Sequence, residues 1–223
     1  SFDRVLRGTK RKESPQGCSL LAHREEVIRE LSECIEAGTF TVRDYREREI
    51  NENGKVRRIQ ILSMKDRIAV HAIMAVVDRH LKKRFIRTTS ASIKGRGMHD
   101  LLAYIHRDMQ EQPESTRYCY KFDISKFYES ISQDTVMDCV RRVFKDERLI
   151  AMLDGFVRMM PHGLSIGLRS SQGLGNLLLS IHLDHVLKDE CGVRHFYRYC
   201  DDGVVLAGSK RELWEVREII HRQ

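Results

Sequence analysis

The stretch Arg194-His195-Phe196-Tyr197-Arg198-Tyr199-Cys200-Asp201-Asp202-Gly203-Val204-Val205-Leu206 decides the fold of this chain. Aromatic residues are frequent in its first half, and its second half is apolar and β-branched. Because Asp-Asp-Gly is typical turn chemistry between two strand-forming runs, the stretch predicts a β-hairpin that carries Asp201 and Asp202 at its turn. The same tripeptide also occurs in hairpins that bind nothing, so a binding role requires another carboxylate elsewhere.

A further candidate carboxylate, Asp123, lies near the end of a segment with alternating character. From residue 118 to 124, aromatic or apolar residues alternate with polar ones, which predicts a strand that delivers Asp123 where the strand meets a loop. A cap for the following turn is the alternative role. Transfer of a nucleotide to a primer uses two hard cations about 3.5–4 Å apart, and such cations prefer carboxylate oxygens. Asp123, Asp201 and Asp202 on neighbouring strands would supply them.

Three blocks together make the sequence resemble reverse transcriptases. They are Phe122-Asp123-Ile124 with Phe127-Tyr128, the segment from residue 163 to 173, and Tyr199-Cys200-Asp201-Asp202. Their order and spacing are similar to those of the family's fingers and palm over nearly the whole chain. The resemblance implies an α+β fold of the right-hand polymerase type, with an antiparallel palm sheet backed by helices.

The resemblance also implies roles for individual residues. In the family, the first aspartate and the later pair bind two Mg²⁺ ions, for which Mn²⁺ is a substitute. Carried over, the catalytic metal ligands are Asp123, Asp201 and Asp202, with the Ile124 backbone as a further ligand. Tyr128 takes the position of an aromatic ring under the sugar of the incoming nucleotide, where no room is left for a 2′-hydroxyl. The alternative for Tyr128 is a core aromatic residue.

The middle block points to a subfamily. Most reverse transcriptases have Gln-Gly-x-x-x-Ser-Pro there, whereas this chain has Ile166-Gly167-Leu168-Arg169-Ser170-Ser171-Gln172. That sequence resembles the enzymes of diversity-generating retroelements, which are bacterial and phage systems that copy a template RNA with frequent errors at adenines. An apolar side chain in place of the amide removes hydrogen-bonding capacity beside the nascent base pair, which should weaken discrimination.

From this block we expect Ile166, Gly167 and Gln172 to contact the nucleotide and to line the templating pocket. Ser170 to Gln172 also have a structural interpretation, as the N-cap of a helix over residues 174–187. The two interpretations are compatible.

Residues 53–62 predict a turn followed by a strand with several basic residues. The resemblance places this strand in the fingers, where a lysine and an arginine bind the incoming triphosphate. Lys55 and Arg57 align best, with Arg58 as the rival of Arg57. Arginine is suited to bidentate phosphate binding, and lysine acts as a point charge. A solvated basic edge strand is the competing explanation.

The organisation of the chain follows from these assignments. Residues 1–115 are expected to form mainly the fingers, with a basic N-terminal extension. Residues 116–223 are expected to form mainly the palm, ending before the helical thumb with which the family continues, so that the thumb is absent. Apolar periodicity predicts helices over residues 21–37, 64–81, 98–109, 147–159 and 174–187, and one that begins at Ser132 or Asp134 and ends at Val143, with a helix-like stretch from 212 to 223.

Composition agrees with a nucleic-acid enzyme. The chain has 39 Lys plus Arg against 32 Asp plus Glu, a net charge of +7 and a pI near 9.2, as expected for a surface that follows a phosphate backbone. The expected partners are an RNA template, a DNA or RNA primer, deoxynucleoside triphosphates and an accessory RNA-binding protein.

Six cysteines show no paired C-x-x-C spacing, so we expect free thiols and no zinc site. The sequence has neither an apolar signal core nor a run of membrane-spanning length. These observations predict a cytoplasmic protein, and the resemblance implies a bacterial or phage origin.

Two alternatives stay open. The chain could be a group II intron-type or phage-defence reverse transcriptase whose middle block has drifted. It could also be a catalytically inactive, polymerase-derived scaffold that binds RNA. The intact set of Asp123, Asp201 and Asp202 argues against the scaffold, because carboxylates that face phosphates weaken binding.

Overall fold

The computed structural model describes residues 1–7, 9–42, 44–52 and 54–222, with the backbone alone at residues 10, 11, 52 and 55. These residues pack into two compact units. Unit 1 comprises Ser1–His80 and Ile131–Ser171, and unit 2 comprises Leu81–Ser130 and Gln172–Gln223. Both units combine helices with antiparallel strands, so the predicted α+β class is confirmed. The division into fingers and palm at residue 115 stays a prediction.

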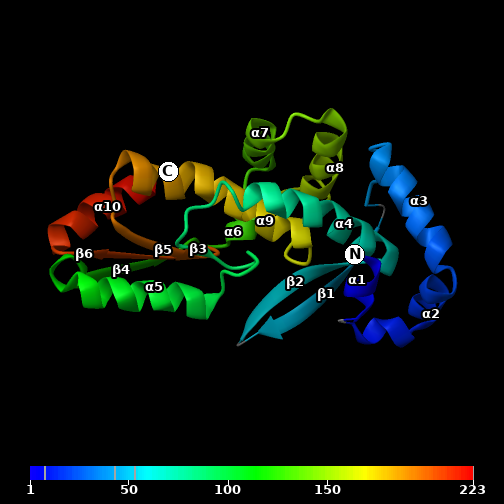
Figure 1. Ribbon diagram of the computed structural model, residues 1–223, viewed down its shortest axis with the longest axis horizontal. Coiled ribbons are helices and arrows are strands. Elements are labelled where there is room, and N and C mark those ends of the chain that lie inside the picture. Colours follow the sequence, from blue (N-terminus) through cyan, green and yellow to red (C-terminus); the bar gives the residue numbers. More distant parts are fainter. Residues whose placement is uncertain (8, 43, 53, 223) are drawn as a thin grey trace. The chain divides into compact units, whose positions relative to one another are not determined.

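Unit 1 consists of a β-hairpin and mainly helical segments (Figure 1). In the hairpin, β1 (Tyr45–Glu52) pairs with β2 (Lys55–Leu62), as the turn and strand predicted over residues 53–62 require. The helical segments are α1 (Phe2–Arg7), the 3-10 helix η1 (Lys10–Glu13), α2 (Pro15–Ala22), α3 (Arg24–Glu36), α4 (Met64–Leu81), α7 (Gln133–Val143) and α8 (Glu147–Val157). Leu81, the last residue of α4, is counted with unit 2.

Local chemistry explains most of these helix ends. The Ser132 hydroxyl accepts a hydrogen bond from the Thr135 N–H at 3.3 Å and caps α7 at the first of the two predicted starting residues. The prediction of one helix over residues 21–37 is wrong, because the chain breaks at His23 between α2 and α3. His23 has left the helical region, with φ −108° and ψ 32°, and its N–H donates to the Ser19 carbonyl.

Unit 2 is built on a four-stranded sheet in the order β3-β5-β6-β4. The predicted hairpin is confirmed as β5 (His195–Tyr199) paired with β6 (Asp202–Ala207), and the predicted strand as β4 (Tyr118–Asp123), antiparallel to β6. The edge strand β3 (Thr89–Ser90) runs parallel to β5. The other elements are α5 (Met98–Glu111), η2 (Pro113–Thr116), α6 (Phe127–Ser130), α9 (Arg169–Leu179), two π-helical segments (Ser180–Asp184 and Val186–Glu190) and α10 (Lys210–Arg222). The first three residues of α9 are counted with unit 1.

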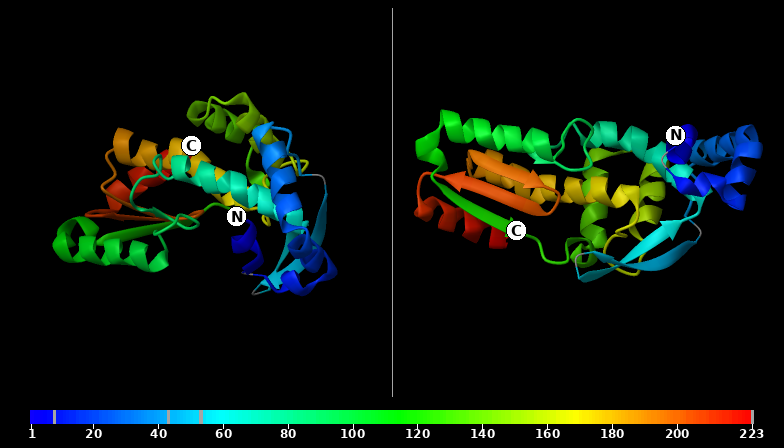
Figure 2. Two further views of the ribbon diagram at one scale, coloured as in Figure 1. Left: turned by 45° about the vertical axis from the view of Figure 1, so that its right-hand side comes forward. Right: turned by 90° about the horizontal axis from the view of Figure 1, so that it is seen from below.

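The two faces of this sheet are covered differently. On one face, Leu101 of α5 packs with Tyr197 and Leu206. Leu213 and Val216 of α10 are buried, and Figure 1 shows α10 and the helix that ends at residue 190 on the opposite side of the sheet from α5. Viewed from below (Figure 2, right), β4 and β6 lie beside α5 and not beneath it. Cys119, Lys121 and Asp123 of β4 are exposed, so the face that carries Asp123 is open to solvent at the β4 edge.

The helix predicted over residues 174–187 begins earlier than predicted and continues as π-helical turns. It begins at Arg169, so Ser170, Ser171 and Gln172 lie inside α9 and the N-cap interpretation is wrong. Ser170 and Ser171 are buried, which means that packing and not capping determines their positions. After Leu179 the helix widens into π-helical turns, where the Ser180 hydroxyl donates to the Arg84 carbonyl at 3.0 Å.

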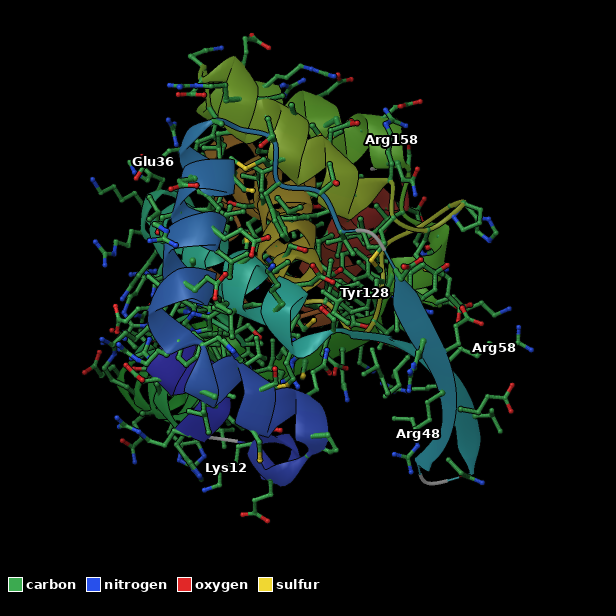
Figure 3. All side chains as sticks on the ribbon, turned by 90° about the vertical axis from the view of Figure 1, so that its right-hand side faces the viewer. Lys12, Glu36, Arg48, Arg58, Tyr128 and Arg158 are labelled. Atoms are coloured by element: carbon green, nitrogen blue, oxygen red, sulfur yellow. The ribbon has the colours of Figure 1, made fainter. Side chains whose placement is uncertain are left out.

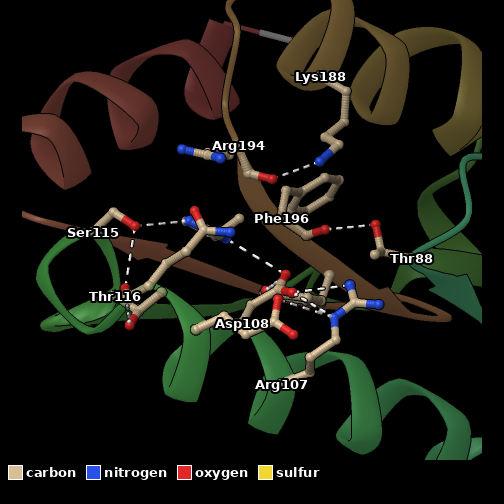
Figure 4. A network of polar contacts seen from close by, with 12 residues as sticks. Thr88, Arg107, Asp108, Ser115, Thr116, Lys188, Arg194 and Phe196 are labelled. Carbon is tan, nitrogen blue, oxygen red and sulfur yellow. Dashed lines mark hydrogen bonds and ion pairs between the residues drawn. The ribbon is translucent and has the colours of Figure 1, made fainter.

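Polar contacts hold β5 in place, some from α5 and others near the first residues of the strand (Figure 4). The Tyr197 hydroxyl donates to the Asp108 carboxylate at 2.6 Å, and Arg107 forms an ion pair with the same carboxylate at 3.0 Å. The Thr88 hydroxyl donates to the Phe196 carbonyl at 2.7 Å, and the Lys188 ammonium donates to the Arg194 carbonyl at 2.6 Å. These bonds hold the strand that leads into the Asp201 turn.

Two expectations about the chain as a whole can be compared with the structure. All six cysteines are free thiols, as predicted. Within the described ranges, no helix combines the length and the apolar character that crossing a membrane requires.

Gly203 provides a test of the packing beneath the site. It lies opposite Phe122 in the β4–β6 register, and a Cβ at this position would be 2.1 Å from the Phe122 ring, which stacks on Phe196. We predict that Gly203→Ala displaces this ring and lowers the free energy of unfolding by about 1–3 kcal/mol, measured by chemical denaturation. The control is Gly155→Ala in α8, where a Cβ meets nothing within 4 Å and stability should hold or rise. Equal effects of the two changes would contradict this packing.

Candidate active site

The strand register of unit 2 brings the predicted carboxylates to one end of the sheet. Asp123, the last residue of β4, is the direct partner of Asp202, the first residue of β6. Directly opposite residues in an antiparallel pair have Cβ atoms about 4.5–5.5 Å apart on the same face. Asp201 lies next to them, in the turn that it forms with Cys200. Asp123 is exposed, and the other two aspartates are half-buried.

One cation lies close to these carboxylates. The Lys121 ammonium is 3.6 Å from Asp202 Oδ1, and Lys121 shares a face with Asp123 because the two are separated by one residue in β4. Lys121 is largely exposed and Asp202 is half-buried, so this solvent-accessible pair adds little stability. It neutralises part of the negative charge at this end of the sheet.

The donor chemistry of the three aspartates fits Mg²⁺, which prefers carboxylate and water oxygens. Among the described residues, however, no group of three or more His, Cys, Asp and Glu side chains is arranged to hold a metal ion. The backbone already places the three residues together, so convergence on an ion requires side-chain rotation about χ1.

Tyr128 lies against the aspartate turn. Lys126, in the left-handed region at φ +51°, turns the chain into the short helix α6, and a hydrogen bond of 3.2 Å joins the Tyr128 hydroxyl to the Cys200 thiol. Burial raises the pKa of Tyr128, with the contact to Cys200 acting in the same direction, so the phenol stays neutral. Gly175 of α9 leaves room for the neighbouring Phe127 ring, since a Cβ there would be 3.0 Å from it. Phe127, at 5% exposure, is the core aromatic of the pair.

Gln172 also belongs to unit 2. Its side-chain oxygen accepts a hydrogen bond from the Ser92 hydroxyl. Ser92 and the preceding Ala91 both have positive φ values, 55° and 78°, which side chains rarely adopt. The exposed Gln172 is thus held by a tight turn between β3 and α5.

Ile166 and Gly167 lie in unit 1, on the segment before α9. Gly167 packs on β2 so closely that a Cβ would be 2.0 Å from the Gln60 carbonyl oxygen. The Ser165 hydroxyl donates to the buried Gln60 side chain at 2.9 Å. A cavity of about 600 Å³ adjoins this contact, lined by residues that include Gly167, Ile59, Arg67 and His71.

The predicted triphosphate ligands also lie in unit 1. Lys55 begins β2, but its side chain is outside the part of the chain that the structure describes. The hairpin register puts Arg57 and Arg58 on opposite faces, with Arg58 in an exposed ion pair with Glu49 at 3.1 Å. Arg48, the partner of Ile59, lies on the same face as Arg57, and Figure 3 shows Arg48 and Arg58 on different sides of the hairpin.

The sequence reasoning missed the polar residues behind the site. Arg198 and Asp184 are both fully buried and form a bidentate ion pair, with distances of 2.7 Å from Nε to Oδ1 and from Nη2 to Oδ2. One signal was available. Each is a charged residue within an otherwise apolar or aromatic run, where an ionised side chain requires a partner.

Comparison with known proteins identifies the family. The family model described as reverse transcriptase (RNA-dependent DNA polymerase) matches residues 47–223. The chain therefore belongs to the reverse transcriptase family. A comparison with curated proteins found no match.

Solved structures support the fold assignment. The apo telomerase of Candida tropicalis truncated from its C-terminal domain has a TM-score of 0.60 at 13% identity, covering 88% of this chain and 51% of that chain. Apo telomerase of the same organism gives 0.62 at 12%, covering 88% and 45%. The Candida albicans telomerase in complex with a TWJ fragment of telomeric RNA gives 0.61 at 11%, covering 83% and 41%. This chain thus spans about half the length of these telomerases, and its fold is that of reverse transcriptase fingers and palm.

His71 makes the stability of unit 1 depend on pH. Burial, with Arg169 nearby, lowers the pKa of His71 to about 4, and its Nδ1 has no hydrogen-bond partner among the described residues. Between pH 6.5 and 4 the unfolded chain binds this proton and the folded chain does not. We predict that the unfolding free energy falls by up to about 3 kcal/mol over this range and that His71→Asn reduces the fall.

The measurement is chemical denaturation at a series of pH values. The control is His162→Asn, since His162 is exposed. A wild-type pH profile in the His71 variant would refute the prediction.

Proposed function

We propose that this chain is the fingers and palm of an RNA-directed DNA polymerase that makes cDNA from an RNA template. The single observation that supports this most strongly is the register of Asp123 opposite Asp202, beside Asp201, on an open edge of the sheet. These residues would hold two Mg²⁺ ions, with Mn²⁺ as a substitute and the Ile124 backbone as a further ligand. When bound, the metals activate the primer 3′-oxygen and stabilise the leaving group.

The residues of the chain have no covalent role in this reaction. The primer oxygen attacks the incoming nucleotide, so no side-chain nucleophile is needed, and Asp123, Asp201 and Asp202 act as ligands. Lys121 neutralises part of their charge before metal binds. Its pairing with Asp202 would have to open during metal binding, which is inexpensive for an exposed pair.

Tyr128 would select deoxyribose by excluding a 2′-hydroxyl. Two observations favour this role over a purely structural one: the ring is tied to Cys200, in the aspartate turn, and its neighbour Phe127 already supplies the core contact. A ring held through its hydroxyl and packed edge-to-face against Phe127 can reject a hydroxyl sterically, whereas a mobile ring would move aside.

Arg57 is favoured over Arg58 as a ligand of the triphosphate. Arg57 shares its face of the hairpin with Ile59, which lines the cavity of unit 1, whereas Arg58 lies on the opposite face. Lys55 keeps the role that the resemblance implies. The partners are then deoxynucleoside triphosphates, an RNA template and a DNA or RNA primer.

Error-prone copying, as in a diversity-generating retroelement, is the finer proposal. Ile166 replaces the usual glutamine, and Gly167 and Gln172 complete the block that would line the templating pocket. The contact of Gly167 with the β2 backbone supports such a role, because only glycine allows that approach. We propose further that the protein is cytoplasmic, bacterial or phage-encoded, and works with an accessory RNA-binding protein. A group II intron-type or phage-defence enzyme is the alternative.

Metal-dependent incorporation tests the activity. We predict that the chain, in excess over a primer annealed to an RNA template, adds one complementary deoxynucleotide in Mg²⁺, and that Asp201→Asn lowers the rate at least 100-fold because a metal ligand is lost. Single-turnover assays avoid any need for processive synthesis. Asp138→Asn on the exposed side of α7 is the control. Equal rates for wild type and Asp201→Asn would contradict the role of Asp201, and no incorporation by the wild-type chain would support the alternative of an inactive RNA-binding scaffold.

Misincorporation tests the subtype. We predict that Ile166→Gln lowers the frequency of wrong nucleotides opposite template adenine by several-fold, because the amide restores hydrogen bonding beside the base pair. Ile166→Leu is the matched apolar control and should keep the wild-type error frequency. Both are measured by sequencing products of the same assay. An unchanged error spectrum in Ile166→Gln would favour the group II intron-type or phage-defence alternative.

A further inference from the structure

The buried side chain of Arg198 reaches the turn that carries the aspartates. Arg198 is one residue before Tyr199 in β5 and is fully buried. One edge of its guanidinium, formed by Nε and Nη2, donates two hydrogen bonds of 2.7 Å to the Asp184 carboxylate. Its Nη1 donates to the Cys200 carbonyl at 2.5 Å and to Asn176 Oδ1 at 2.8 Å. Asp184 thus fixes the plane of the group, and Nη1 is directed at the turn.

The turn is a place where the backbone requires such support. Cys200 has φ +57°, in the left-handed region, which costs a non-glycine residue about 1–2 kcal/mol. Its N–H donates to the Ser90 carbonyl at 3.3 Å, so Ser90 holds the residue on one side and Arg198 on the other. Asp201 and Asp202 follow directly, and their direction depends on the Cys200 peptide.

The same network extends to the loop that holds Gln172. Asn176 accepts from Arg198 through its oxygen and donates through its nitrogen to the Ala91 carbonyl at 3.1 Å. Ala91 and Ser92 are left-handed non-glycine residues of that loop, and Ser92 donates to Gln172. Arg198 and Asn176 therefore connect the turn that carries the aspartates to the loop that holds Gln172.

Stability alone does not account for a charge at this position. Replacing a buried ion pair by apolar residues of similar volume is often neutral or stabilising. An apolar residue could fill the space of Arg198, but it could not donate to the Cys200 carbonyl. The planar guanidinium has enough donors to satisfy Asp184, Asn176 and that carbonyl together.

We propose that Arg198 is a positioning residue, which holds the Cys200 carbonyl and thereby sets the direction in which Asp201 and Asp202 present their carboxylates to divalent metal. Asp184 orients the guanidinium, and Asn176 couples it to the loop of Gln172. The inference rests on the proposed metal-dependent function and deepens it.

The test measures metal binding directly, with Mn²⁺ alone as the probe and the chain without nucleic acid. Electron paramagnetic resonance titration gives the Mn²⁺ affinity, and near-ultraviolet circular dichroism reports whether each variant is folded. Arg198→Lys keeps the positive charge opposite Asp184 but loses the planar set of donors that reaches Asp184 and the Cys200 carbonyl together. We expect it to fold and to bind Mn²⁺ about tenfold or more weakly, with kcat for incorporation falling and KM for the nucleotide changing little.

Two controls separate positioning from stability. Thr89→Val removes the hydroxyl that donates to Asp184 at 2.7 Å, a bond equally buried but without contact to Cys200. It should lower the melting temperature while the Mn²⁺ affinity stays within about twofold. Arg194→Lys, at an exposed position of the same segment, should change neither quantity. A loss of stability in Arg198→Lys with wild-type Mn²⁺ affinity would overturn the proposal.

A double variant keeps the proposal testable if Arg198→Lys does not fold. Arg198→Met combined with Asp184→Leu removes both charges and leaves apolar packing, so the fold should persist while Mn²⁺ affinity falls as in Arg198→Lys. A folded double variant with wild-type affinity would overturn the proposal.

Failure of this inference can be told apart from failure of the proposed function. Wild-type incorporation together with undisturbed Mn²⁺ binding in the Arg198 variants refutes the inference alone. Arg198-dependent Mn²⁺ binding without any incorporation supports the inference and refutes the polymerase activity. A wild-type chain that binds no Mn²⁺ refutes both.

Discussion

The bidentate ion pair between Arg198 and Asp184 is the interaction on which the candidate site depends. Both side chains are fully buried, so each requires the other, and removing one partner of such a pair typically costs about 3–5 kcal/mol. The pair joins the π-helical segment Ser180–Asp184 to β5, and Nη1 of Arg198 donates to the Cys200 carbonyl. The aspartate turn is therefore supported by the core of unit 2 and does not behave as a free hairpin loop.

Much of the fold could be predicted because its elements carry strong local signals. The alternation around Tyr120 predicts β4, and the Asp-Asp-Gly turn predicts the hairpin that contains Asp202. The apolar periodicity of residues 64–81 matches α4 at both ends. In each case the local preference and the tertiary environment favour the same structure, which is the condition under which reasoning from sequence succeeds.

The features that could not be predicted depend on distant partners. The start of α9 at Arg169 goes with the burial of Ser170 and Ser171, which no local capping rule reports. The break at His23 reflects one residue leaving the helical region within a continuous apolar pattern. Likewise, the sequence contains Arg198 and Asp184, but only the fold makes them a pair. The aspartates could be proposed because two strand patterns place them at strand ends, and the family resemblance then implied their roles as metal ligands.

Each unit, taken by itself, carries some of the residues to which roles are proposed. In unit 2, the strand register and the Tyr128–Cys200 bond gather the aspartates and the proposed sugar-selecting ring. In unit 1, the close approach of Gly167 to β2 and the face of the hairpin that carries Arg57 supply the features proposed for template and triphosphate. The family assignment covers both units, since the matched residues run from 47 to 223. The kind of copying rests on Ile166 to Gln172 alone.

The central claim is that Asp123, Asp201 and Asp202 form a divalent-metal centre. The most direct measurement is a crystal structure of the chain grown in MnCl₂, with an anomalous difference map calculated at the manganese edge. The account predicts anomalous density within coordination distance of carboxylate oxygens from Asp123 and the Asp201–Asp202 turn. A well-ordered site without such density, or manganese bound only elsewhere on the chain, would contradict it.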